Sequence, residues 1–218
     1  MIELHQVGLE YPGHETVKVL SDITLSIERG EFVALVGPSG AGKTSLLNLI
    51  GGLDTPTAGT LEVDGQDLGT LDDNQLSVYR NQKIGFIFQS FLLHPNRTAL
   101  QNVTVPLYFG SQSMSEGIRR GRQLLEELGL AGLEHRPVGR LSGGQRQRVA
   151  VARAMVNQPK VILADEPVGS LDEQSASLVA DALARAAEAG VTVVSATHDS
   201  VITERATRVL KVEGGRVK

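Results

Sequence analysis

The stretch EFVALVGPSGAGKTSLLNLI, residues 31–50, decides the fold. Its first part, Glu31–Val36, is nearly all apolar, which is typical of a strand buried on both faces of a parallel sheet. Three closely spaced glycines follow, and then a helix is predicted over Lys43–Ile50, ended by Gly51 and Gly52. A buried strand, a glycine-rich loop and a helix in this order are the context that a phosphate-binding loop requires.

The loop Gly37–Thr44 matches the P-loop pattern, in which two glycines with four residues between them are followed by Lys and Thr. The glycines let successive backbone N–H groups point inward, and together with the helix N-terminus these favour a phosphate chain. Lys43 supplies a positive charge for the β- and γ-phosphates, and the Thr44 hydroxyl can ligate Mg²⁺. The alternative is a glycine-rich turn that fits by chance, which the flanking strand and helix make the minor reading.

A second short apolar strand, Val161–Ala164, ends in two adjacent carboxylates, Asp165 and Glu166. Asp165 stands where a carboxylate would hold Mg²⁺, and Glu166 could polarise the attacking water as a general base. An acidic turn after a strand is common by itself. Next to a P-loop, the pair instead predicts hydrolysis of a nucleoside triphosphate.

The pattern beyond these motifs predicts an α/β fold with a mainly parallel sheet. The alanine-rich helical stretch Gln174–Ala189 is followed by the apolar run Val191–Ala196, so strand, helix and strand alternate. In such sheets ligands bind at the carboxyl ends of the strands. The alternating runs Ile2–Leu9 and Leu20–Ile27 predict a β-rich start, and Asn96–Val156 reads as a mainly helical lobe.

Composition narrows the function classes. The chain has 218 residues with a formal charge of −4, which argues against a whole-domain nucleic-acid binder, and the run Arg119, Arg120, Arg122 reads as a solvated helix face. It has no cysteine, so disulfides, thiol catalysis and thiolate metal sites are excluded. The start is not a secretory signal, and the apolar runs are too short to cross a membrane. We expect a soluble, cytoplasmic protein that would take any membrane part from a partner.

A further motif, Leu141–Gln145 (LSGGQ), opens a helix that is predicted over Gly143–Asn157. Ser142 suits a helix N-cap, and Gly143 and Gly144 expose backbone amides at the helix start. The residues alone allow either a further anion site or an ordinary capped helix, and they favour the ordinary capped helix.

The chain resembles the nucleotide-binding domain of ATP-binding cassette (ABC) transporters. The resemblance rests on four motifs and their spacing: GPSGAGKT, LSGGQRQR, VILADEP and TH. The match covers essentially the whole chain, and LSGGQ between the two other motifs is highly specific to that family. The resemblance implies ATP and Mg²⁺ as cofactors and a head-to-tail homodimer with two ATP molecules at its interface. Each P-loop would bind one ATP, and Ser142–Gln145 of the second copy would complete that ATP's binding site.

The resemblance assigns roles to four further residues. Tyr11 would stack on adenine, Gln89 would contact Mg²⁺ and the attacking water, and His198 would contact the γ-phosphate. Asp172 would join the two active sites across the dimer, although it also suits a helix cap, and both roles are compatible. The catalytic set is then Lys43, Gln89, Glu166 and His198, and the metal set is Thr44, Gln89 and Asp165. The nucleotide-binding set is Tyr11, Gly37, Pro38, Ser39, Gly40, Ala41, Gly42, Lys43, Thr44, Ser45, Ser142, Gly143, Gly144, Gln145 and Asp172.

As a P-loop NTPase of this family, the chain would form one ABC ATPase domain over residues 1–218, in three parts. We expect an antiparallel β subdomain of residues 1–30 and 58–70, and a P-loop core of residues 31–57 and 158–218. A helical subdomain of about residues 90–157 would carry the LSGGQ motif.

The segment 91–107 (FLLHPNRTALQNVTVPL) is similar to the bacterial subgroup with lipoprotein-release and macrolide-export ATPases. The resemblance implies a separate membrane permease that docks near Ser90–Tyr108, on the inner face of the cell membrane. Phe91, Leu92, Leu93, Leu107 and Phe109 would offer apolar surface there, or some would belong to the lobe's own core. The alternatives are a cell-division-type ATPase that signals to periplasmic enzymes through a membrane subunit and, less favoured, a soluble ABC-type ATPase.

Overall fold

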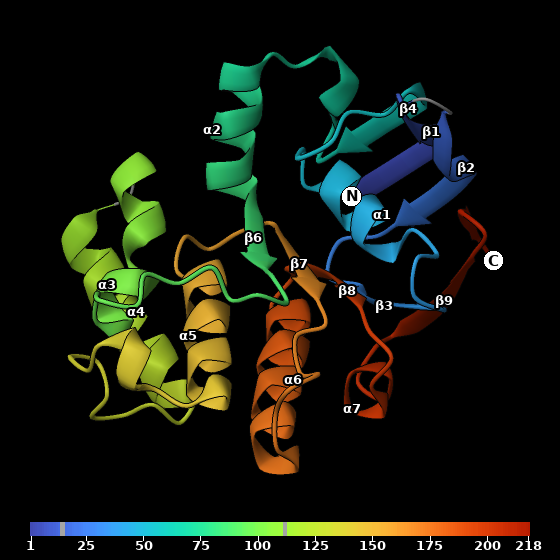
Figure 1. The fold of residues 1–218 in the computed structure, drawn as a ribbon. Helices are drawn as coiled ribbons and strands as arrows, with labels where there is room; N and C mark the ends of the chain where they lie inside the picture. Colours follow the sequence, from blue (N-terminus) through green and yellow to red (C-terminus); the bar gives the residue numbers. More distant parts are fainter. Residues whose placement is uncertain (14–15, 111–112) are drawn as a thin grey trace.

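The fold is built on a sheet with the strand order β10-β9-β3-β8-β7-β6, seen in the computed structural model, which describes residues 1–13, 16–110 and 113–218 (Figure 1). Strands β9, β3, β8, β7 and β6 are parallel, and only β10 among the described strands of this sheet pairs antiparallel. The strands are β3 (Phe32–Val36), β6 (Ile84–Ile87), β7 (Val161–Asp165), β8 (Thr192–Ala196), β9 (Arg208–Glu213) and β10 (Arg216–Val217). The predicted mainly parallel sheet is therefore present.

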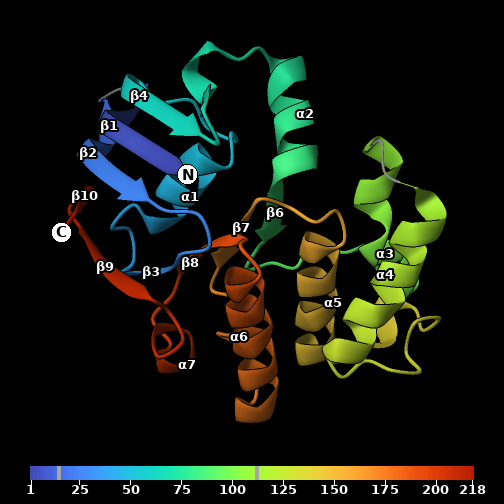
Figure 2. The same cartoon turned by 180° about the vertical axis from the view of Figure 1, so that it is seen from behind.

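A second, smaller sheet is antiparallel and has the order β2-β1-β4-β5 (Figure 2). Its strands are β1 (Ile2–Tyr11), β2 (Val17–Ile27), β4 (Ala58–Val63) and β5 (Gln66–Asp67), with the 3₁₀ helix η1 (Leu68–Thr70) after them. Helix α1 (Lys43–Ile50) lies between the two sheets and contacts β7, β8 and β2. The N-terminal β-rich segments thus cover one face of the main sheet.

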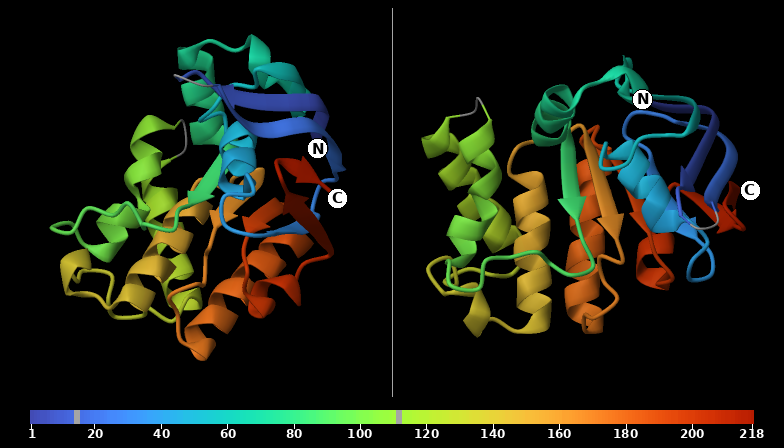
Figure 3. Two further views of the ribbon diagram at one scale, coloured as in Figure 1. Left: turned by 45° about the vertical axis from the view of Figure 1, so that its right-hand side comes forward. Right: turned by 45° about the horizontal axis from the view of Figure 1, so that its top comes forward.

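Helices α5 (Gly143–Met155) and α6 (Glu173–Glu188) pack on the other face of the main sheet (Figure 1). Beside α5, the group of α3 (Ala99–Val103), η2 (Val105–Phe109) and α4 (Met114–Glu127) extends away from the sheet (Figure 3). The remaining helices are α2 (Asp73–Lys83), η3 (Val138–Arg140) and α7 (Ser200–Thr203).

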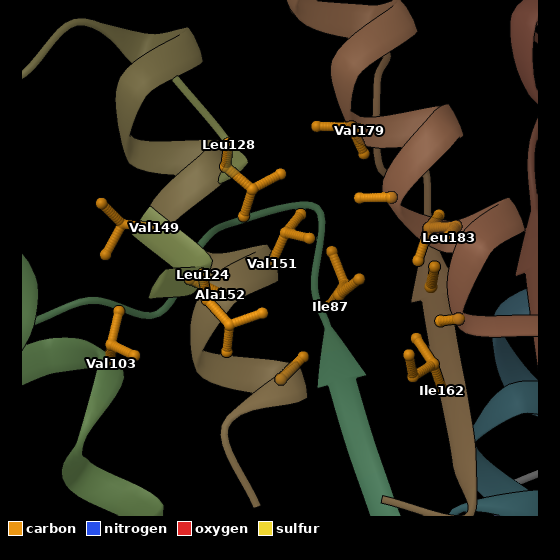
Figure 4. Close-up of a cluster of buried hydrophobic side chains, with 14 of the residues drawn as sticks. Ile87, Val103, Leu124, Leu128, Val149, Val151, Ala152, Ile162, Val179 and Leu183 are labelled. Atoms are coloured by element: carbon orange, nitrogen blue, oxygen red, sulfur yellow. The ribbon is translucent and has the colours of Figure 1, made fainter. Parts of the chain in front are cut away.

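Side chains of the buried strands alternate between two cores. On β3, Phe32 and Ala34 join the core that contains α5 and α6, whereas Val33 and Leu35 join the core beneath α1 and the small sheet. Figure 4 shows the first of these cores, where Ile87 of β6 lies among side chains of α4, α5 and α6. This two-sided burial fixes the sheet in place, and burying one such side chain contributes about 1.5–3 kcal/mol.

Candidate active site: the phosphate-binding cleft

A cleft of about 970 Å³ opens at the carboxyl ends of β3, β8, β7 and β6. The strand register explains this convergence, because Ala196 of β8 pairs with Leu35 on one side and with Asp165 on the other. The loops that follow these strands therefore leave the sheet together. The predicted site residues among the lining are Gly37, Pro38, Ser39, Gly40, Ala41, Gly42, Lys43, Thr44, Ser45, Gln89, Asp165, Glu166 and His198.

The P-loop backbone needs its glycines for two separate reasons. Gly42 has a φ of 102°, a conformation that residues with a side chain rarely adopt. Gly37 also has a positive φ, and a Cβ there would collide with the carbonyl oxygen of Val212 in β9. The Lys43 ammonium donates hydrogen bonds to the carbonyl oxygens of Gly37 (2.7 Å) and Pro38 (3.0 Å), so its charge lies within the loop.

The N-terminus of α1 faces this cleft, and no side chain of the described residues caps it. Side chains cap α2, α3, α5, α6 and α7, whereas the N-terminus of α4 is, like that of α1, without a cap from any side chain that the structure describes. The first backbone N–H groups of a helix have no partner within the helix, and they carry the positive end of its dipole. An anion seated in the loop would satisfy them.

Thr44 and Asp165 form a pair beside the loop, in which the Thr44 hydroxyl donates to Asp165 Oδ2 at 2.9 Å. Burial raises the pKa of the Asp165 carboxyl and the hydrogen bond from Thr44 lowers it, with a net rise. Mg²⁺ takes one or two carboxylates together with substrate phosphates and waters. This donor set, with Gln89 in the same lining, therefore fits Mg²⁺ held jointly with a phosphate chain.

Glu166 stands at the tip of β7 in a left-handed conformation with a φ of 48°. Its backbone N–H donates to the carbonyl oxygen of Ala196 at 2.9 Å, which anchors the turn to β8. One carboxylate oxygen lies 2.9 Å from His198 Nδ1, and the other accepts a bond of 3.5 Å from the Thr197 hydroxyl. The hydrogen bond to Glu166, and then its negative charge, raise the pKa of the His198 imidazole.

Some predicted site residues lie outside this cleft in the single chain. The Tyr11 hydroxyl donates to Asp54 at 2.8 Å, and 40% of the residue is exposed. Ser142 and Gln145 form a reciprocal capping box at the start of α5, and Asp172 caps α6 through Ser175. The capping alternatives are therefore confirmed for Ser142 and Asp172, and their contact with nucleotide stays a prediction.

The cleft also contains residues that the sequence did not point to as part of the site. Phe91, Gly169 and Ser170 line it, and Thr197 contacts Glu166. Phe91 was expected as docking surface or as part of the helical lobe's core. Thr197 directly precedes His198 and could have been suspected, but Phe91 reaches the cleft through a turn that no sequence pattern marks.

Comparisons with known proteins agree with this geometry. A family model described as "ABC transporter" matches residues 20–169. The Macrolide export ATP-binding/permease protein MacB of Chromobacterium violaceum is 45% identical over 217 residues, which are 99% of this chain and 34% of that protein. The chain thus spans about a third of such relatives. The ABC transporter ATP-binding protein YknY of Bacillus subtilis (strain 168) is 42% identical, covering 100% of this chain and 95% of that protein.

A solved structure has the same fold. The dimeric post-hydrolysis state of the ATP-binding cassette MJ0796, bound to ADP and Pi, superposes with a TM-score of 0.93 at 40% identity, covering 100% of this chain and 97% of that one. With the cleft described above, these findings define a P-loop ATPase. More narrowly, the chain belongs to the ABC transporter family, whose ATP-binding and ATP-hydrolysing domain it forms. The predictions of fold class and ATPase activity are confirmed.

Proposed function

We propose that this chain powers a membrane permease of the export type, through closure and opening of a homodimer around two ATP molecules. The observation that carries the proposal is the convergence of the P-loop, the Thr44–Asp165 pair and the Glu166–His198 pair in one cleft. The dimeric MJ0796 cassette supports the homodimer, and the name of the MacB relatives supports export. The domain division into β part, core and helical subdomain belongs to the same proposal.

The chain's own groups account for the chemistry. In the proposed mechanism the Lys43 ammonium moves its hydrogen bonds from the loop carbonyls to the phosphates. The backbone N–H groups at the uncapped N-terminus of α1 bind the same phosphates. Thr44, Asp165 and Gln89 would hold Mg²⁺, which when bound neutralises charge on the phosphate oxygens. Glu166 accepts a proton from the attacking water while the water oxygen forms the new bond to the γ-phosphorus. The bond between that phosphorus and ADP breaks, and ADP leaves with its electron pair. His198 orients the Glu166 carboxylate and contacts the departing phosphate.

The permease would dock over the segment Ser90–Tyr108 and its neighbour α2. A groove of about 290 Å³ lies there, lined by residues of α2, β6, η2 and α5. Exposed apolar side chains occupy the same segments: Val78 (54% exposed), Leu92 (59%), Tyr108 (64%) and Phe109 (77%). Of the predicted apolar residues, Leu107 is instead buried in the core, so the core alternative holds for it.

No helix among the described residues is long and apolar enough to span a membrane. We propose that the domain works as a peripheral protein on the inner face of the cell membrane, held there by the permease. A regulatory ATPase of the cell-division type would use the same cleft and the same docking surface. A soluble ABC-type ATPase would leave the exposed aromatic side chains without a partner, which is why the permease-bound forms are favoured.

Co-expression with a tagged export-type permease from the same organism tests the proposal. We expect the two to copurify, the permease to stimulate ATP hydrolysis, and Tyr108→Ser with Phe109→Ser to remove both effects while leaving the basal ATPase rate intact. Val17→Ser, at an apolar residue that is 58% exposed in the small sheet, is the control. Copurification unaffected by the double variant would contradict this docking surface. A transport assay in vesicles then separates export from signalling.

A further inference from the structure

The turn that follows Gln89 has an unfavourable backbone conformation. Phe91 and Leu92 are consecutive residues with positive φ, 54° and 48°. Both carry side chains that disfavour this left-handed region, and neither is the Gly or Asn that usually occupies it. Such a conformation persists only where the surrounding structure enforces it.

Beside the turn's own backbone hydrogen bonds, from Phe91 N–H to Phe88 and from Leu92 N–H to Ser90, one side chain bonds to both strained residues. The guanidinium of Arg153, in the last turn of α5, donates to both strained residues: Nη2 to the Phe91 carbonyl oxygen at 2.8 Å, and Nη1 to the Leu92 carbonyl oxygen. The planar fork of an arginine matches two neighbouring acceptors in a way that a lysine cannot. No carboxylate among the described residues forms an ion pair with Arg153, and burial lowers its pKa. The carbonyl oxygens of Phe91 and Leu92 are therefore the groups that stabilise its partly buried charge.

A second arginine, near the N-terminal end of α5, contacts the same turn. The guanidinium carbon of Arg146 lies 5.7 Å from the centre of the Phe91 ring, in cation–π geometry. Arg146 and Arg153 are seven residues apart, which places them on one face of α5 two turns from each other. Helix α5 thus holds Phe91 by both its ring and its backbone.

Arg153 also connects two cavities. It lines the groove beneath α2 and η2, whereas Phe91, whose carbonyl it holds, lines the phosphate cleft beside Gln89. A change in the groove that moved Arg153 would release the turn that positions Gln89 and Phe91 at the cleft.

From these contacts we infer that Arg153 is a positioning residue for ATP hydrolysis, which holds the Phe91–Leu92 turn left-handed and so sets where Gln89 and Phe91 face the cleft. This rests on the proposed mechanism, in which Gln89 contributes to the reacting centre. Arg153 itself touches neither nucleotide nor metal. Its loss should therefore lower kcat and leave ATP affinity unchanged, because the P-loop contacts remain.

The test compares Arg153→Lys with two matched variants. Arg208→Lys is the control, because Arg208 also donates to a backbone carbonyl, that of Ser26, and lies at the amino end of β9, away from the cleft. Leu92→Gly is the rescue variant, because glycine adopts the left-handed region without strain and the Leu92 side chain is mostly exposed. Each protein is assayed for kcat and KM with MgATP, for affinity toward a fluorescent ATP analogue, and for its unfolding midpoint.

We expect Arg153→Lys to lower kcat about tenfold or more with ATP affinity within about twofold, and Arg208→Lys to remain within about twofold in both. Adding Leu92→Gly to Arg153→Lys should restore at least about half of the lost kcat. A kcat for Arg153→Lys equal to that of the Arg208→Lys control would overturn the inference, and so would a loss that Leu92→Gly leaves unrestored. If the parent chain itself neither bound nor hydrolysed ATP, the proposed mechanism would fail instead, so the two failures are distinguishable.

Discussion

The positions of Glu166 and His198 show how the ends of neighbouring strands bring catalytic side chains together. Glu166 follows β7 and His198 follows β8, and because these strands are neighbours in the sheet the two side chains meet at 2.9 Å. The left-handed φ of Glu166 turns its side chain toward β8 and away from the continuing strand direction. A non-glycine residue in this conformation at a site is backbone strain held for function.

The His198–Glu166 contact predicts a pH dependence with a definite sign. Because Glu166 raises the pKa of His198, the folded state binds the imidazole proton more tightly than the unfolded state does. The contribution to stability is therefore complete below the ordinary histidine pKa near 6.5, and it disappears as the pH rises through the folded-state pKa. An NMR titration should find the His198 pKa above 6.5 in the parent and closer to 6.5 in Glu166→Gln. Equal values in the two proteins would show that the contact does not form.

The contacts of Lys43 predict how strongly ATP binding depends on this side chain. Replacing it with alanine removes the ammonium that lies among the loop carbonyls, and we expect ATP affinity to fall more than about 30-fold. Equilibrium binding of a fluorescent ATP analogue measures this, with Lys18→Ala, at an exposed lysine of the small sheet, as the control. Tight binding by the Lys43 variant would contradict the assignment of the loop.

The sequence was sufficient for the P-loop and the carboxylate pair, because strand, loop and helix follow one another locally. The roles of Gln89 and His198 came from the family resemblance, since a lone glutamine or histidine carries no pattern. The turn at Phe91 could not have been predicted, because its left-handed backbone depends on Arg153, 62 residues further along the chain.

At the scale of elements, the predicted helix Lys43–Ile50 agrees with α1 at both ends, and the helix predicted over Gly143–Asn157 begins at the capping box that opens α5. Helix α2 was missed. Its sequence, DNQLSVYRNQK, buries only Tyr79, so it lacks the apolar stripe that marks a helix. The pair Asp72 and Gln75 forms a capping box and was the available signal.

The packing of α5 on β6 predicts a stability effect. A Cβ at Gly85 of β6 would collide with the backbone carbonyl of Ala154, which cannot rotate away. We expect Gly85→Ala to lower the free energy of unfolding by about 1–3 kcal/mol. Chemical denaturation measures it, with Gly69→Ala as the control, where the nearest atom to the added Cβ is the Asp67 carboxylate oxygen at 3.3 Å. Equal stabilities of the two variants would show that α5 and β6 are not packed this closely.

At the scale of the whole molecule, Ser142–Gln145 are not among the residues that line the chain's own cleft, and in the proposed homodimer they would instead complete the cleft of the second copy. Mixing tests this arrangement. Lys43→Ala disables the P-loop and Ser142→Arg disables the LSGGQ motif, so each variant alone should be inactive. A mixed dimer keeps one intact site, and an equimolar mixture should therefore recover about a quarter of the parent activity. No recovery, from variants shown to be folded, would contradict a site built from two copies.

The central claim is that this cleft binds the triphosphate of ATP and that Glu166 activates the water that attacks it. The most direct measurement is a single-turnover ATPase assay on Glu166→Gln, combined with equilibrium ATP binding and light scattering. We predict that the variant binds ATP as the parent does, hydrolyses it at least about 100-fold more slowly, and accumulates as a dimer. Hydrolysis at the parent rate would contradict the claim.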